Sequence, residues 1–157
     1  MAIPKFTPPP YKPTAQNSTR QDTWEVRLEV AGNNFGVWDK KTGGELDSDE
    51  VVYYPGGMDP KLSLGGRAMP GNITLQKIYD GVDDHQRVQA LLNAVGRHSC
   101  KVTQQPLDFE GNRYGQKFMW SGKVKRVLVP DHDSEATGAA MIEVEITIED
   151  RPHLVDP

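Results

Sequence analysis

The fold is decided by residues 35–75, where glycines punctuate short β-prone pieces: FGVWD (35–39), TGGE (42–45), YYPGG (53–57), SLGGR (63–67) and GNITL (71–75). Glycine tolerates the positive φ angles and close backbone approaches that turns and β-bulges require. Glycine pairs between short strands are therefore typical of a small antiparallel β structure. This stretch contains no obvious catalytic residue.

Strand patterns continue on both sides of this stretch. From Trp24 to Val30, apolar residues alternate with charged ones, which predicts a strand with one buried face. A turn at 31–34 then returns the chain as a hairpin partner through 35–38. Further strands are expected at 51–54, 61–64, 73–79 and 99–104.

One helix is expected near 83–97. Asp83 and Asp84 suit the positive end of a helix dipole, and Gly96 is a stop signal. Apolar residues recur at helical spacing between them, at Val88, Leu91, Leu92 and Val95. A single amphipathic helix among strands normally covers one open face of a sheet or barrel.

The second half of the chain predicts a long hairpin, from 118–129 and 140–149, joined by the polar loop 130–138. Folding about this loop places Lys123 near Glu145 and Lys125 near Glu143. Opposite charges across a hairpin add only about 0.2–1 kcal/mol per pair, but they help to fix the register. The simplest interpretation of this charged side, which includes Glu149, is a solvated face.

Composition limits the classes of function. The chain has 157 residues, enough for one domain, of which only 36% are hydrophobic. This shortage of apolar residues fits strands with one wet face, or a subunit stabilised partly by its neighbours. A net charge of -4 argues against binding nucleic acid through phosphate contacts. No apolar run approaches the length of a membrane span, and the single cysteine, Cys100, fits synthesis in a reducing cytosol.

The chain divides into a Pro-rich N-terminal arm (1–23), a β domain (24–150) and a short C-terminal tail (151–157). The arm is either a disordered end or a segment that orders on a neighbouring subunit. The motif Asp131-His132-Asp133 and the cysteine in His98-Ser99-Cys100 allow metal or nucleophile hypotheses, but a polar loop and a core cysteine are the simpler interpretations. We predict no catalytic, metal-binding or cofactor-binding residues, and no enzyme.

The order of the glycine-punctuated pieces resembles the tail tube proteins of long-tailed bacteriophages, which are related to the inner tubes of contractile injection systems. The resemblance covers about Trp24 to Glu149 and is most specific from Gly36 to Leu75. It implies a mainly β protein with one helix, an antiparallel β-sandwich or barrel that assembles into hexameric rings. The rings would stack into a tube around a tape-measure protein, with tip and terminator proteins at its ends. Genomic DNA would pass through without specific binding.

The resemblance also assigns expected roles to residues. Two hairpins per subunit would line the lumen, with 61–79 and 117–149 as candidates, and glutamates there would help to repel DNA. The long loop after the first hairpin would reach a neighbouring subunit or ring, where its carboxylates would pair with basic groups such as Arg67 or Lys61. Weak cation binding is another option for these acids. The expected lumen or register residues are Lys123, Lys125, Glu143, Glu145 and Glu149; the expected inter-subunit contacts are Phe35, Trp38, Glu45, Asp47, Asp49, Glu50, Tyr53, Tyr54 and Arg67.

Two interpretations stay open at this stage. For the aromatic residues at 35, 38, 53 and 54, ordinary core packing is as good an explanation as an interface. For the whole chain, the alternative function is a stand-alone β-barrel module that binds a small ligand or glycan. A tail tube protein would be found in the virion after synthesis in the bacterial cytoplasm.

Overall fold

The structure is a computed structural model that describes residues 3–5, 20, 22–108 and 110–156. Most of the Pro-rich arm predicted at 1–23 therefore lies outside the described residues. The strands of the described part are β1 (Trp24–Val30), β2 (Asn33–Trp38), β3 (Lys40–Gly43), β4 (Leu46–Ser48), β5 (Val52–Tyr53), β6 (Leu62–Ser63), β7 (Ala68–Pro70), β8 (Ile73–Ile78), β9 (Ser99–Pro106), β10 (Lys117–Leu128), β11 (Met141–Ile148) and β12 (His153–Val155), and α1 spans Asp83–Ala94.

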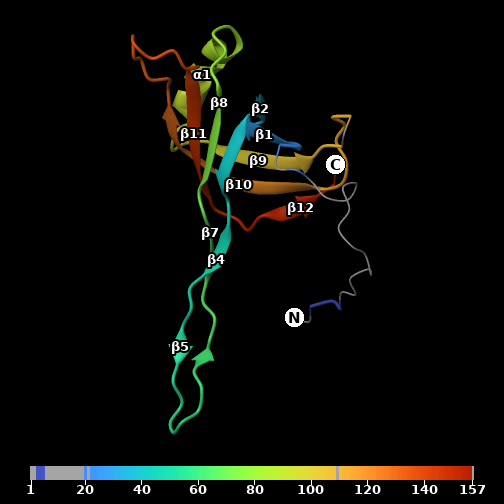
Figure 1. The fold of residues 1–157 in the computed structure, drawn as a ribbon, viewed down its shortest axis with the longest axis vertical. Helices are drawn as coiled ribbons and strands as arrows, with labels where there is room; N and C mark the ends of the chain where they lie inside the picture. Colours follow the sequence, from blue (N-terminus) through green and yellow to red (C-terminus); the bar gives the residue numbers. More distant parts are fainter. Residues whose placement is uncertain (1–2, 6–19, 21, 109, 157) are drawn as a thin grey trace.

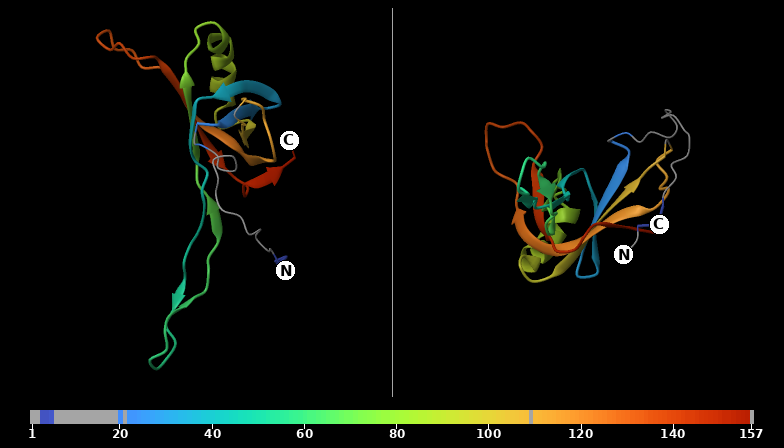
Figure 2. Two further views of the ribbon diagram at one scale, coloured as in Figure 1. Left: turned by 45° about the vertical axis from the view of Figure 1, so that its right-hand side comes forward. Right: turned by 90° about the horizontal axis from the view of Figure 1, so that it is seen from below.

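The main sheet curls around the core. Its order is β2-β1-β9-β10-β11-β8-β3, and all neighbouring strands in this order are antiparallel. Since β2 and β3 follow each other across Asp39, the two ends of this order are joined by the chain itself (Figure 2). The Asp39 N–H donates to the Gln76 carbonyl, and the Asp39 carboxylate accepts the Ile78 N–H at 3.0 Å. The predicted mainly β fold with one helix is confirmed.

The core is built from the alternating faces that the sequence predicts. Apolar side chains of β1, β8, β9, β10 and β11 point inward and lose nearly all contact with solvent. Burial of each such side chain contributes about 1.5–3 kcal/mol before entropy is counted. The largest fully buried residues are Leu28, Ile73, Leu75, Val102, Val124, Ile142, Val144 and Ile146.

The strand β10 is shared between two parts of the sheet. Its first half pairs with β9 and with the short edge strand β12, and its second half pairs with β11. The predicted C-terminal tail thus contributes a strand at 153–155, directly after Pro152. This placement suits proline, which cannot donate to a ladder but can precede an edge strand.

The glycine-punctuated stretch folds as one long hairpin rather than as separate hairpins. Pairing continues from β3–β8 to β4–β7 and then to β5–β6, so residues 46–70 leave the body as a narrow arm (Figure 1). The segment 54–61, which includes Gly56 and Gly57, forms the end of the arm. We call residues 46–70 the arm below; the name does not refer to the Pro-rich N-terminal segment 1–23.

The helix is shorter than predicted, because it ends at Ala94 instead of near 97. Gly96, with φ of 72°, follows it, as expected of a stop signal. At its start, the carboxylate of Asp80 accepts the N–H groups of Val82 and Asp83 at 2.8 and 3.3 Å. These two bonds hold the pKa of Asp80 below its ordinary value.

The predicted apolar stripe of the helix is wrong at one position. Leu92 is exposed, while Leu91 and Ala94 are buried in the core and Val88 and Val95 pack against it. The stripe is therefore narrower than the sequence suggested, and the small side chain of Ala94 lets the last turn lie close to the sheet.

Candidate assembly surfaces

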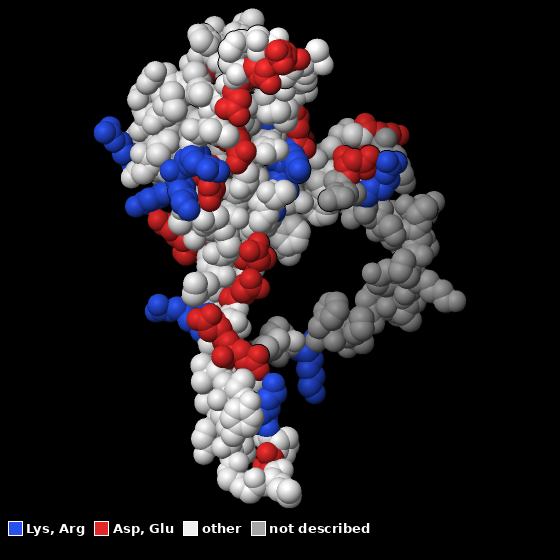
Figure 3. Space-filling view, turned by 60° about the vertical axis from the view of Figure 1, so that its left-hand side comes forward, with Lys and Arg blue, Asp and Glu red and all other residues white. Residues whose placement is uncertain are grey.

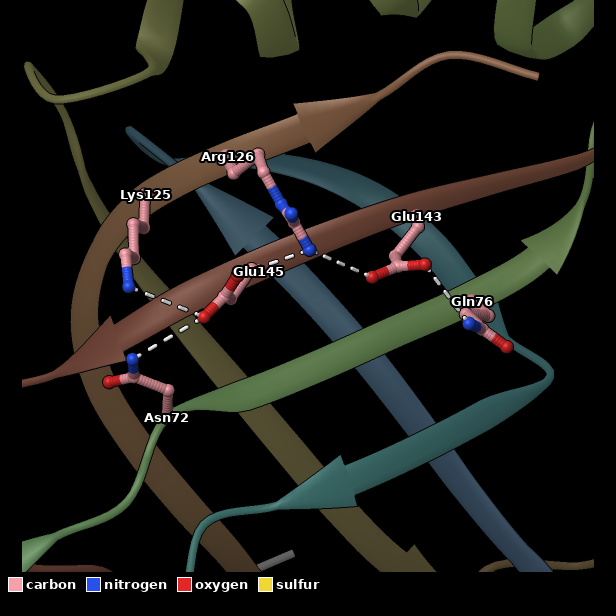
Figure 4. Close-up of polar contacts among 6 residues, drawn as sticks. All are labelled: Asn72, Gln76, Lys125, Arg126, Glu143 and Glu145. Atoms are coloured by element: carbon pink, nitrogen blue, oxygen red, sulfur yellow. Dashed lines mark hydrogen bonds and ion pairs between the residues drawn. The ribbon is translucent and has the colours of Figure 1, made fainter. Parts of the chain in front are cut away.

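The first candidate surface is the polar outer face of the β10–β11 hairpin and the adjoining strand β8 (Figure 4). The Arg126 guanidinium lies 3.3 Å from both Glu143 and Glu145, and the Lys125 ammonium lies 3.5 Å from Glu145. Two side-chain amides complete the network. Gln76, in β8, donates to Glu143 at 3.1 Å, and Asn72, directly before β8, donates to Glu145 at 3.4 Å. Each carboxylate thus has partners on two neighbouring strands.

The predicted pairing of this hairpin is wrong by two residues. Lys123 lies opposite Thr147 rather than Glu145, and its ammonium is 3.9 Å from Glu149. Lys125 contacts Glu145 instead of Glu143. A two-residue shift keeps the same side chains on the same face. The alternation of the sequence therefore predicted the charged face correctly but could not predict which residues lie opposite each other.

Sequence reasoning missed Arg126 as a member of this face, and a β-bulge explains why. The register shifts between Val124 and Arg126, so that Lys125 and Arg126 both stand against Glu145. Strict alternation would turn Arg126 towards the core. The sequence did contain a signal. Lys125 and Arg126 are consecutive cations within an otherwise apolar strand, and a bulge can place two consecutive side chains on the same face.

The charges of this hairpin face balance. Three cations (Lys123, Lys125 and Arg126) contact three carboxylates (Glu143, Glu145 and Glu149). The glutamates are therefore paired with cations, and this face is polar and close to neutral; its place in a lumen stays a prediction. Exposed pairs of this kind contribute about 0–1 kcal/mol each, so they specify register more than stability.

The second candidate surface is the arm. It has no core of its own, and it carries exposed apolar side chains on both strands. Figure 3 shows acidic side chains along the part next to the body, whereas the tip is mostly uncharged. An exposed apolar patch on an extended hairpin marks a surface that binds another molecule. Its exposed apolar residues are Leu46, Val51, Tyr53, Tyr54, Met58, Leu62, Leu64 and Met69.

The aromatic residues predicted as contacts divide into two pairs. Tyr53 and Tyr54 lie on the arm, 55% and 75% exposed. Phe35 and Trp38 are 5% and 3% exposed and belong to the core cluster. Phe35 and Trp38 are therefore core residues, which is the alternative that the sequence left open. Only Tyr53 and Tyr54 remain candidates for contact residues.

The predicted acidic contacts are all exposed: Asp47, Asp49 and Glu50 lie on the outgoing side of the arm, and Glu45 lies directly before it. Arg67 lies on the return strand, where its carbonyl accepts the Asp49 N–H at 3.4 Å. Within the described part of the chain, neither Arg67 nor Lys61 forms an ion pair with these carboxylates.

The root of the arm is packed tightly against the body. The Trp120 indole N–H donates to the Gly44 carbonyl at 3.0 Å, and the Lys41 ammonium lies 4.1 Å from the centre of the Trp120 ring. Burial lowers the pKa of Lys41, and Glu45 opposes this shift. These contacts hold the segment from which the arm leaves the body.

The metal and nucleophile hypotheses of the sequence concern the loop 130–138, the arm and Cys100, all of which the structure describes. No group of three or more His, Cys, Asp or Glu side chains there is arranged to hold a metal ion, either in the loop 130–138 or on the arm. Cys100 is 2% exposed in β9. Burial, with a smaller effect of Glu149, raises the pKa of its thiol to about 12. The thiol is therefore protonated at neutral pH and unsuited to nucleophilic attack.

This pKa predicts how stability depends on pH. Because ionisation of Cys100 is suppressed in the folded state, its contribution is complete below about pH 8.5, the ordinary thiol pKa. The contribution falls as the pH rises towards about 12, the folded value. We expect the difference in unfolding free energy between the wild type and Cys100→Val to shift steadily against the wild type from pH 8 to 10.5, measured by urea denaturation. A constant difference would contradict the assigned burial.

No family model and no curated protein matches the sequence. Solved structures do match. A chain in the cap that terminates the tube of the anti-feeding prophage (AFP) superposes with a TM-score of 0.73 at 14% identity, covering 94% of this chain and 97% of that chain. A chain in the extended PVC sheath–tube complex, an extracellular contractile injection system, gives 0.68 at 15% identity, with 91% and 95% covered. A chain in the six-fold symmetrised AFP baseplate gives 0.69 at 14% identity, with 93% and 97% covered.

The protein has a tail-tube fold. The match extends over nearly all of this chain and of each neighbour. The family resemblance drawn from the sequence is confirmed at the level of the fold, which is what identities of 14–15% support. Among the residues that the structure describes, no helix is long and apolar enough to cross a membrane.

Proposed function

We propose that the protein is a structural subunit of a tail tube, forming hexameric rings that stack into a hollow conduit. The observation that carries the proposal is the arm: an extended hairpin with exposed apolar side chains, on a barrel whose fold is shared with chains of tube assemblies. A hairpin that buries so little of its own surface gains stability when another subunit covers it. The six-fold symmetry of one neighbouring assembly supports the number of subunits.

The polar face of β10 and β11 is the proposed wall of the lumen. Its cations are matched by carboxylates, so few positive charges remain to hold the phosphates of a passing polymer. Strong binding of DNA requires several uncompensated cations, and each one adds to the salt dependence. A neutral wall therefore suits passage of DNA without specific binding. The tape-measure, tip and terminator proteins are the proposed partners within the tail of a virion.

Removal of the outer arm tests this proposal. In the variant lacking residues 51–64, Glu50 joins Gly65, which leaves a glycine-containing connection to close β4–β7. None of the deleted residues belongs to the core, so we expect an unchanged unfolding midpoint. We also expect rings or tubes to disappear from negative-stain micrographs, because the apolar contact surface is lost.

A point variant gives the matched control. Tyr53→Ser/Tyr54→Ser should weaken assembly, whereas Tyr114→Ser, which replaces a tyrosine 44% exposed on the body, should not. Wild-type protein that remains monomeric over the whole concentration series would contradict self-assembly and favour the ligand-binding module. Tubes formed by the deletion variant would instead show that the arm is dispensable.

A further inference from the structure

The main sheet carries an apolar face that continues beyond the packed core. Alternate side chains of β1, β9 and β10 form the core at Val26, Val102 and Trp120. The same faces of β1 and β10 continue two residues earlier with Trp24 and Phe118. At this end β9, β10 and β12 extend away from α1 (Figure 1), so the helix does not cover these side chains.

Two aromatic rings and a leucine make up this uncovered face. The ring centres of Trp24 and Phe118 lie 6.2 Å apart, and Leu154 of β12 pairs directly with Phe118. Phe118 is 39% exposed and Leu154 is 52% exposed. Trp120 lies next in the row, 6.0 Å from Phe118, but it is only 6% exposed and belongs to the core. We call Trp24, Phe118 and Leu154 the aromatic platform.

The chain itself contains a segment with the composition that suits such a platform. Residues 8–13 read PPPYKP, in which Pro10 and Pro13 have the spacing P-x-x-P. Such sequences favour the polyproline II helix, and segments of this kind dock in grooves lined by aromatic side chains. This helix advances about 9 Å per turn of three residues, so one turn is long enough to pass two neighbouring rings.

The chain turns back just before the platform. The N–H and the hydroxyl of Thr23 both donate to the Arg20 carbonyl, at 3.2 and 2.9 Å, and the Arg20 guanidinium lies 2.7 Å from the Asp22 carboxylate. A bond from the fourth residue to the first is that of a β-turn, which reverses the chain. The residues before Arg20 therefore do not continue the line of β1 away from the platform. The seven steps from Pro13 to Arg20 can span up to about 25 Å.

We propose that residues 8–13 dock on the aromatic platform of their own chain. These residues lie outside the described part of the structure, and the assignment differs from both interpretations that the sequence left open, a disordered end and a contact with a neighbouring subunit. A short connection holds the two partners at an effective concentration in the millimolar range, which favours docking within one chain over docking between copies. The docked segment covers apolar surface that a single subunit otherwise exposes. This inference does not depend on the proposed assembly.

Iodide quenching of tryptophan fluorescence tests the inference in dilute, monomeric protein. Trp38 and Trp120 are 3% and 6% exposed, so this charged quencher reaches mainly Trp24. Because Pro10→Ser/Pro13→Ser uncovers the platform, it should raise the quenching constant about twofold. Pro55→Ser/Pro60→Ser removes two prolines from the end of the arm and should leave the constant unchanged. Equal constants for the wild type and Pro10→Ser/Pro13→Ser would overturn the proposal.

Two further measurements locate the contact. Leu154→Ser, at an exposed position of β12, should raise the quenching constant in the wild-type background and hardly change it in the Pro10→Ser/Pro13→Ser background. The peptide PPPYKP at millimolar concentration should restore protection to the latter variant, whereas PPSYKS should not. Equal effects of Leu154→Ser in both backgrounds would show that the platform is not the docking site. Protection that increases with protein concentration would place the segment on a second copy and overturn docking within one chain.

Discussion

Replacing Asp84 with alanine should lower the free energy of unfolding by about 3–5 kcal/mol, because it leaves a buried ammonium without its counter-charge. Asp84 and Lys77 form an ion pair at 2.5 Å, with side chains only 5% and 15% exposed. The other carboxylate oxygen of Asp84 accepts the Asp80 N–H at 2.7 Å, and the Lys77 ammonium lies 5.3 Å from the centre of the Trp38 ring. Urea denaturation monitored by tryptophan fluorescence measures the loss.

Two further variants separate the charge from the packing. Asp83→Ala, at the exposed neighbouring position in the same helical turn, should change the free energy of unfolding by less than about 1 kcal/mol. Lys77→Met/Asp84→Leu removes both charges and should recover most of the stability lost in Asp84→Ala. A double variant as unstable as the single one would mean that hydrogen bonding to Asp80, rather than the unpaired lysine, dominates.

This ion pair joins the strand that bears the arm to the start of the helix. The strand β8 runs from the root of the arm to Lys77, and α1 begins a few residues later at the opposite end of the body (Figure 1). Asp39 clamps the end of β8 by accepting the Ile78 N–H. Together these contacts join the strand that bears the arm to the helix.

The sequence predicted features that depend on local pattern. Alternation located β1 and the β10–β11 hairpin, and helical spacing located α1, because one-sided burial imposes these periods on a strand or a helix. The face that carries the charged residues of the hairpin was therefore correct, even though the partners of Lys123 and Lys125 were not.

Features that depend on long-range strand pairing could not be predicted from the sequence. Nothing local in β3, β4 or β5 shows that they pair in succession with one returning segment, so the arm emerged only from the structure. The bulge before Arg126 and the burial of Phe35 and Trp38 likewise depend on what lies across the sheet. Aromatic residues serve cores and interfaces equally well, and only the three-dimensional arrangement separates the two uses.

The second large effect is expected at Gly43, where β3 leads into the arm. This residue has a φ of 87°, a left-handed conformation that disfavours a side chain, and a Cβ added there would collide with the carbonyl of Asn72. Strain in this region costs about 1–2 kcal/mol, and crowding against backbone costs about 1–3 kcal/mol more. Gly43→Ala should therefore lower the free energy of unfolding by about 2–5 kcal/mol, measured by urea denaturation.

Gly32 offers a matched control for this prediction. It has nearly the same φ, 84°, but an added Cβ would meet nothing within 4 Å. Gly32→Ala should therefore show the conformational strain alone, about 1–2 kcal/mol. The excess loss in Gly43→Ala measures how firmly Asn72 and β8 hold the root of the arm. Equal losses in the two variants would mean that the root yields to a methyl group, and the direction of the arm would then be set by the neighbouring subunit rather than by the barrel.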